Sequence, residues 1–250
     1  MSLAFNDTST LKGIAQIYEQ EIGVNQGDIT GNTAKMKAFT ADVNLAWDDY
    51  VSIAIQSSGQ WQFDDSNHTD YPIIQTNLVA NQRDYTFTTD QQGNLILDIY
   101  KVLIADTNGV FTEITPVDVN QPKPKTRGSD GFSDGQNTTG TPKEYDKLGN
   151  GIFLDPIPNY SVTNGLKIYI NREASYFTYT DTTKKPGCPG IHHEYFALKP
   201  ALKYALRHNH SNAQALQQRV TLYERDIKLY FSLRDKDTRK GIRPLVESNE

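Results

Sequence analysis

The residues best suited to chemistry gather near position 190, where Cys188 precedes His192, His193 and Glu194. A thiol beside imidazoles and a carboxylate could supply a nucleophile with its base, or three ligands of a metal site. Both kinds of site require further groups held in fixed geometry, which nearness in the sequence does not supply. We therefore expect an ordinary helix start, with the histidines facing solvent or capping the first turn, and we assign no catalytic, metal or cofactor-binding residue.

Two other polar features also favour a structural interpretation. The segment 128–135 is rich in glycine and acids, but it lacks the Gly-Lys-Ser/Thr ending of a phosphate loop and the acid spacing of a calcium loop. It lies within residues 120–141, where apolar side chains are almost absent, so we expect a mobile loop or an arm ordered by a neighbour. Two pairs of neighbouring aspartates, which could suggest general acid and base catalysis, are expected to be ordinary surface acids: Asp48-Asp49 and Asp64-Asp65.

The composition of this 250-residue chain disfavours several classes of protein. Cys188 is the single cysteine, so an intramolecular disulfide and a cysteine-rich zinc framework are both excluded. No apolar run approaches the roughly 18 residues of a membrane span, and the first residues do not read as a secretory signal. We therefore expect a protein of the cytosol that has no membrane partner.

Charge is distributed unevenly along the chain. Residues 1–180 hold 12 Lys/Arg and 22 Asp/Glu, a net charge of −10, and residues 181–250 hold the other 13 and 8, a net charge of +5, which together give −5. The overall sign disfavours a whole-chain nucleic-acid binder. An acidic body with a basic end suits contacts between copies or with an acidic partner, although a solvated basic helix face would have the same composition.

The spacing of apolar residues predicts helices at the start of the chain. Thr10 is expected to cap a short helix that ends at Gly23. A longer helix is expected from residue 32 or 33 to residues 58 and 59. Its apolar stripe, which must face a partner surface, comprises Met36, Phe39, Val43, Ala46, Trp47, Tyr50, Ile53 and Ala54.

Two further helices are expected after the Pro- and Gly-rich turn at 186–190. Pro200 should kink the first of them, and a polar break at 208–212 separates it from the second, as in an antiparallel hairpin. The inward residues predicted for the first helix are Ile191, Tyr195, Leu198, Leu202, Ala205 and Leu206. Those predicted for the second are Leu216, Val220, Tyr223, Ile227 and Tyr230.

Between about residues 61 and 180 the pattern changes to short β-rich runs separated by Asn, Asp, Gly and Pro. In one run Leu166, Ile168 and Ile170 alternate with more polar residues, which indicates a strand with one buried face. Strands are expected at 85–87, 96–105, 111–119, 152–154 and 166–171.

Together these elements predict an α+β fold, in which a helical bundle formed by the N- and C-terminal helices carries an inserted antiparallel β-sandwich or small β-barrel. We expect the helical domain to comprise residues 1–59 plus 182–235, and the β domain residues 60–181. Residues 236–250 are expected to form a charged C-terminal tail that is loose in the free protein.

Six segments carry a resemblance to a known family. They are 61–72 (WQFDDSNHTDYP), 78–87 (LVANQRDYTF), 140–145 (GTPKEY), 151–158 (GIFLDPIP), 166–172 (LKIYINR) and 177–187 (FTYTDTTKKPG), followed by the helix from His192. In order and spacing they resemble the head-to-tail connector, or neck adaptor, proteins of short-tailed bacteriophages, including ring proteins of crAss-like phages. The resemblance covers roughly residues 30–235 and brings no catalytic motif with it.

The resemblance implies a structural protein of the virion neck that is made in the host cytoplasm. It implies a ring, commonly of twelve copies, that docks below the portal protein, meets the next tail or neck protein and lets DNA pass through its lumen without sequence recognition. Each subunit of a ring presents different surfaces to its two neighbours. We expect inter-subunit or portal contacts from the basic C-terminal residues Arg219, Arg225, Lys228, Arg234, Lys236, Arg239, Lys240 and Arg243.

Two other functions stay open at this point. A carbohydrate-binding virion module would hold a glycan against aromatic side chains of the β domain. A cell-wall hydrolase of the tail would need a catalytic acid, for which Glu194 is the candidate. We favour the structural role over an enzyme, because no catalytic motif accompanies these residues.

Overall fold

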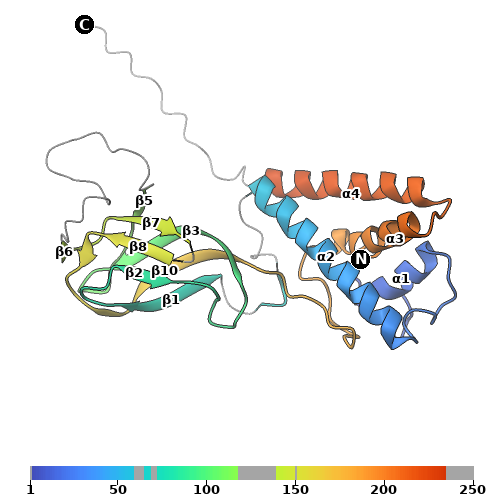
Figure 1. The fold of residues 1–250 in the computed structure, drawn as a ribbon, viewed down its shortest axis with the longest axis horizontal. Helices are drawn as coiled ribbons and strands as arrows, with labels where there is room; N and C mark the ends of the chain where they lie inside the picture. Colours follow the sequence, from blue (N-terminus) through green and yellow to red (C-terminus); the bar gives the residue numbers. More distant parts are fainter. Residues whose placement is uncertain (1, 59–64, 69–71, 118–138, 150, 235–250) are drawn as a thin grey trace, which may run out of the picture. The chain divides into compact units, whose positions relative to one another are not determined.

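The computed structural model describes residues 2–58, 65–68, 72–117, 139–149 and 151–234, and the chain forms two compact units (Figure 1). Residues 1–68 with 174–250 form the helical unit, and residues 69–173 form the β unit. The fold is α+β, as predicted, because four α-helices and several largely antiparallel sheets occur among the described residues. Most of the predicted loop at 120–141 and all of the predicted tail at 236–250 lie outside the described residues.

The first helix, α1 (Ile14–Glu21), begins later than predicted. Its N-cap is Gly13, whereas the N–H of Thr10 donates to the Asp7 carboxylate at 2.9 Å. Asp7 therefore closes a turn of its own before the helix, and the expected cap at Thr10 is wrong. The predicted end is confirmed, since Gly23 follows the helix with a φ of 71°, a left-handed conformation that favours glycine.

The long helix α2 (Thr33–Ser58) has the predicted bounds. The side-chain oxygen of Asn32 accepts hydrogen bonds from the N–H groups of Ala34 and Lys35 at 3.0 and 3.1 Å, so Asn32 is the N-cap. The predicted stripe is buried apart from Ile53, which is half-buried. A helix of this length is stabilised mainly by that packed stripe.

The C-terminal helices are α3 (Tyr195–Arg207) and α4 (Ala213–Arg234), and a short 3₁₀ turn, η2 (Gly190–His192), precedes α3. Two of the inward residues predicted for the first of these helices are wrong: Ile191 and Leu206 are 64% and 59% exposed. Ile191 lies in the turn before α3, and the helix buries a face that includes Phe196 and Ala201 instead. In α4 the buried face ends at Phe231. Tyr230, which was predicted to face inward, is exposed.

The helical unit has one core, and α3 packs against each of the other three helices. Aromatic rings fill much of it: the Trp47 and Phe196 centroids lie 4.6 Å apart, and Phe5 stacks on Phe177 at 4.4 Å. Phe177 and Ala174 were expected in the β domain, but both are buried in this core. The boundary predicted at residue 181 therefore lies too late in the chain.

The chain leaves the helical unit and returns to it at neighbouring points. The Asp65 carboxylate is buried and accepts the N–H of Ser175 at 3.1 Å, and the N–H of Ser66 donates to the Gly187 carbonyl at 3.0 Å. The expectation of a surface acid at Asp65 is thus wrong, because this carboxylate ties two distant segments together. A Cβ at Gly187 would come within 1.8 Å of Asp65, so only glycine fits there.

The β unit contains two four-stranded sheets, ordered β1-β10-β3-β4 and β2-β8-β7-β5, and the two-stranded pair β6-β9. Neither of the four-stranded sheets closes into a barrel within the described part of the chain, so the barrel alternative is wrong. The strand bounds are β1 (Ile73–Leu78), β2 (Asp84–Thr86), β3 (Ile96–Ala105), β4 (Phe111–Glu113), β5 (Thr115–Pro116), β6 (Thr139–Gly140), β7 (Glu144–Leu148), β8 (Gly151–Asp155), β9 (Ile157–Pro158) and β10 (Val162–Arg172).

Pairing within the β unit is mostly antiparallel, with two exceptions that the sequence did not predict. β5 pairs with β7, and β6 with β9, in parallel. The single strand predicted at 111–119 is divided at buried Ile114, with β4 in the first sheet and β5 in the second. The run therefore passes from one sheet to the other, and its second half pairs with β7 in parallel, with Thr115 opposite Glu144.

Both four-stranded sheets contribute to one hydrophobic cluster in the β unit. Val102 and Ile168 come from the first sheet, and Ile152 and Leu154 from the second; all four are fully buried or nearly so. Leu166, Ile168 and Ile170 are each buried, as their alternation predicted.

Candidate interaction surface

The two histidines that were expected to face solvent are each only 2% exposed. His192 Nδ1 lies 2.9 Å from the Tyr50 hydroxyl. His193 Nδ1 accepts the N–H of Leu3 at 2.9 Å, and its Nε2 lies 3.0 Å from the carbonyl of Cys188. Burial lowers the pKa of both rings, that of His192 to about 4. The prediction of solvent-facing histidines is wrong, and both rings act as neutral hydrogen-bonding groups of the core.

Glu194, the third polar member of this sequence cluster, faces other partners. Its carboxylate accepts from Arg219 at 2.6 Å and from the Tyr223 hydroxyl at 2.7 Å. In the described ranges, no group of three or more His, Cys, Asp or Glu side chains is placed to hold a metal ion. The cluster near position 190 is therefore built into the packing of the helical unit.

Arg219, the first of the predicted contact residues, is engaged within its own chain. One guanidinium nitrogen bonds both oxygens of Glu21 at 2.8 Å, and another bonds Glu194 at 2.6 Å. Partial burial lowers the pKa of Arg219, but the bonds to the two carboxylates outweigh that effect and hold the pKa above its ordinary value. Arg219 thus fastens α4 to the end of α1 and to the start of α3.

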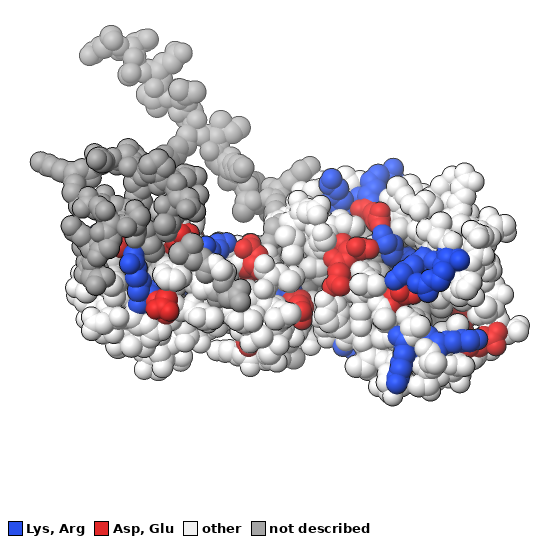
Figure 2. Space-filling view, viewed as in Figure 1, with Lys and Arg blue, Asp and Glu red and all other residues white. Residues whose placement is uncertain are grey.

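The other predicted contact residues are more open or lie outside the described part of the chain. Arg225 and Lys228 are exposed on α4, and Arg225 has a loose ion pair with Asp226 at 3.6 Å. Figure 2 shows that cationic and acidic side chains are interspersed over the helical unit on the face in view. Arg234 is the last residue of α4. The remaining predicted contact residues lie outside the described ranges: Lys236, Arg239, Lys240 and Arg243.

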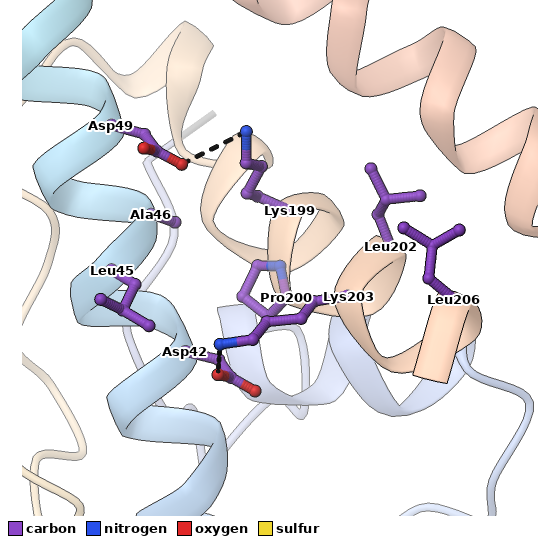
Figure 3. Close-up of a pocket in the computed structure, with 9 residues that line it drawn as sticks. All are labelled: Asp42, Leu45, Ala46, Asp49, Lys199, Pro200, Leu202, Lys203 and Leu206. Carbon is purple, nitrogen blue, oxygen red and sulfur yellow. Dashed lines mark hydrogen bonds and ion pairs between the residues drawn. The ribbon is translucent and has the colours of Figure 1, made fainter. Parts of the chain in front are cut away.

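A groove of about 300 Å³ lies between α2 and α3 (Figure 3). Its apolar lining consists of Leu45, Ala46, Pro200, Leu202 and Leu206. The rim leucines from the two helices are solvent-exposed: Leu45 is 52% exposed, as open as Leu206 opposite. We call this feature the α2–α3 groove.

The four charged residues of the α2–α3 groove are paired across it. Lys199 lies 3.2 Å from Asp49 and 2.6 Å from Glu224 of α4, and Lys203 pairs with Asp42. Partial burial lowers the pKa of Lys199, but the hydrogen bond to Glu224 and the nearby Asp49 raise it more, so its pKa lies above the usual range. Because these charges meet each other, the groove offers mainly apolar surface to an incoming group.

A second apolar feature lies on α4. Leu222, Leu229 and Leu233 are 49%, 51% and 55% exposed, and we call them the leucine row. At 100° per residue they share one side of the helix, well away from the side that buries Val220 and Ile227.

No protein-family model matches this chain, and no curated protein is significantly similar to it. Within the described residues, none of the helices is both long and apolar enough to span a bilayer. The α2–α3 groove and the leucine row are therefore the features from which a function can be argued.

Sequence reasoning missed both features. Leu45 lies off the predicted α2 stripe, and Leu206 was assigned to the core. The sequence did contain a signal for the leucine row. Its members recur at steps of seven and four residues on α4, and none of them is among the inward residues predicted for that helix. Two apolar stripes on one helix indicate two packing partners.

Proposed function

We propose that this chain is a structural virion protein, a head-to-tail adaptor ring subunit that docks below the portal and links it to the next tail or neck protein, with a lumen for DNA. The observation that carries the proposal is the pair of exposed apolar features, the α2–α3 groove and the leucine row. Grouped exposed apolar side chains are typical of surfaces that contact other proteins. The resemblance of the six sequence segments to neck adaptor proteins gives those contacts a place in the virion.

The position of the reactive residues supports a binding role. His192 and His193 are buried hydrogen-bonding groups, and Glu194 is held by Arg219 and Tyr223. Glu194 is the acid that a cell-wall hydrolase would need, and both of its carboxylate oxygens are engaged by side chains of α4.

A finer description of the fold belongs to the same proposal. We infer that the four helices act as one bundle and that the two four-stranded sheets form a sandwich inserted into it. The shared hydrophobic cluster of the two sheets supports the sandwich, and the packing of α3 against the other three helices supports the bundle.

Binding to portal rings tests the proposed function. Purified protein is mixed with a purified portal from the same phage and examined by negative-stain and cryo-electron microscopy. We expect a ring of copies on the tail-facing side of the portal, and immunogold labelling of virions at the neck. A protein that binds neither portal nor further copies of itself, and that is absent from virions, would contradict the proposal.

A second candidate function has a specific observation in its favour. Tyr100 and Tyr169 of the first sheet are partly exposed, with ring centroids 6.1 Å apart, and paired aromatic rings are suited to stacking against a sugar. Glycan-array binding by the whole chain that is lost in Tyr169→Ala would support a carbohydrate-binding virion module.

A further inference from the structure

We propose that the leucine row of one copy docks into the α2–α3 groove of the next copy. This inference rests on the proposed ring, and it names the seam between neighbouring subunits. Both partners in the contact are described surfaces of the helical unit, so the inference requires no segment outside the structure.

The shapes of the two features are complementary. A groove between two helices is a common receptor for a third helix, which inserts apolar anchors spaced by four and seven residues. Leu222 and Leu229 are seven residues apart and Leu233 follows after four, which places the anchors about 10 and 6 Å apart along α4. The exposed rim of the groove, Leu45 and Leu206, would close over the inserted side chains.

Charge supports the same pairing. Residues 38–58 of α2 contain Asp42, Asp48 and Asp49 but no lysine or arginine. Asp49 keeps about half of its side chain exposed although it pairs with Lys199, so it can accept a second cation. On the incoming helix, exposed Arg225 lies about 60° around α4 from the leucine row and Asp226 about 40° on the other side, and their ion pair is loose at 3.6 Å. Arg225 can therefore pair with Asp49 across the contact.

The contact must join different copies. The buried side of α4 packs against α2 and α3, and the leucine row faces away from that side, so it cannot enter the groove of its own chain. A row that fits a different surface of the next copy makes a heterologous contact, which propagates from copy to copy and closes into a ring when the rotation allows.

Two acidic substitutions separate the halves of the contact. Leu229→Glu disables the row and leaves the groove intact, and Leu45→Glu disables the groove and leaves the row intact. Each variant alone should self-associate at least about tenfold more weakly than wild type, because a carboxylate would be buried against apolar surface. Mixed in equal amounts, the two should form a one-to-one heterodimer that grows no further, since one working contact remains.

Sedimentation velocity and electron microscopy would measure assembly of each sample, alone and on portal rings. Leu97→Glu is the matched control: Leu97 lies on β3, is 49% exposed, and its replacement should leave assembly unchanged. Circular dichroism and thermal unfolding should show that all three variants are folded, because each replaced leucine is about half exposed.

The outcomes distinguish this inference from the proposed function. If Leu229→Glu or Leu45→Glu forms rings as well as wild type does, the contact between the leucine row and the α2–α3 groove is wrong. The proposed ring would then still be supported. If Leu229→Glu blocks assembly but the mixture yields no heterodimer, the row has another occupant, such as a second row or the portal, and the seam is wrong. Wild type that forms no oligomer, alone or on portal, would overturn both.

Discussion

His192 is held as a neutral ring at the centre of the helical unit, which makes stability depend on pH. Burial lowers its folded-state pKa from 6.5 to about 4, and the adjacent His193 adds to the effect. Between pH 6.5 and 4 the unfolded chain binds more protons than the folded chain, so the free energy of unfolding falls as the pH falls through this window. We expect a loss of roughly 3 kcal/mol by pH 4, because one unit of pKa shift corresponds to about 1.4 kcal/mol.

Urea unfolding at a series of pH values would measure this dependence. In His192→Gln the slope between pH 6.5 and 4 should become shallower, whatever the variant does to stability at pH 7. His210→Gln replaces an exposed histidine and should retain the wild-type slope. An unchanged slope in His192→Gln would show that this ring is not the group that titrates.

Arg219 and Arg225 lie six residues apart on α4 but should behave differently on substitution. Arg219→Ala removes the bonds to Glu21 and Glu194 and should lower the free energy of unfolding by about 1 kcal/mol, a modest value because the guanidinium is partly exposed. Arg225→Ala removes only a loose pair with Asp226 and should stay within about 0.5 kcal/mol of wild type. Chemical denaturation would measure both. Equal losses would contradict the structural assignment of Arg219.

At the scale of elements, α2 depends on its cap. Asn32→Ala should lower the free energy of unfolding by about 1 kcal/mol, since two N–H groups of the first turn lose their acceptor. Asn32→Asp preserves an acceptor oxygen and should remain close to wild type. Thermal unfolding followed by circular dichroism would compare the three proteins, and equal midpoints for wild type and Asn32→Ala would contradict the capping role.

Elements with a strong local signal could be predicted from the sequence. α2 has a cap, a long apolar stripe and a polar end, and its bounds are as predicted. The strands β1 and β7 were missed, because Gln75, Thr76 and Asn77 interrupt the apolar pattern of the first and Glu144, Asp146 and Lys147 that of the second. β1 forms because β10, distant in the sequence, completes its backbone hydrogen bonds, whereas β7 pairs with the adjacent strand β8 on one side and with the more distant β5 on the other.

The candidate surface was harder to predict for a related reason. Periodicity gives the face that a helix buries, but the residues left open depend on how the helices pack. Leu206 continues the apolar pattern of α3 and yet lies at the rim of the α2–α3 groove. The burial of His192 and His193 likewise follows from Tyr50 and the N-terminal segment at Leu3, which lie far away in the sequence.

At the scale of the whole molecule, the helical unit should fold without the β unit. Of the described residues between 72 and 173, none belongs to its core, and the chain leaves and returns beside Asp65 and Ser175. Joining residues 1–68 to 174–250 through a short Gly/Ser linker should give a helical protein that unfolds cooperatively, measured by circular dichroism and calorimetry. A sample without a cooperative transition would contradict this expectation.

The matched control for this deletion uses the boundaries that the sequence predicted. Joining residues 1–59 to 182–250 also removes Asp65, Ala174 and Phe177, and with them part of the helical core. This shorter protein should be less stable than the first by several kcal/mol, mainly through loss of the Phe177 ring, since deletion of a buried aromatic side chain costs about 3–5 kcal/mol. Comparable stability of the two would place the boundary elsewhere.

The close approach of Asp65 to Ser175 and Gly187 has an evolutionary consequence. A module whose two connections emerge side by side can be exchanged for one of another length or architecture while the scaffold that carries it keeps its geometry. Natural variation should therefore be greatest between residues 69 and 173, whereas Gly187 should resist change, because any larger residue there would push the two connections apart.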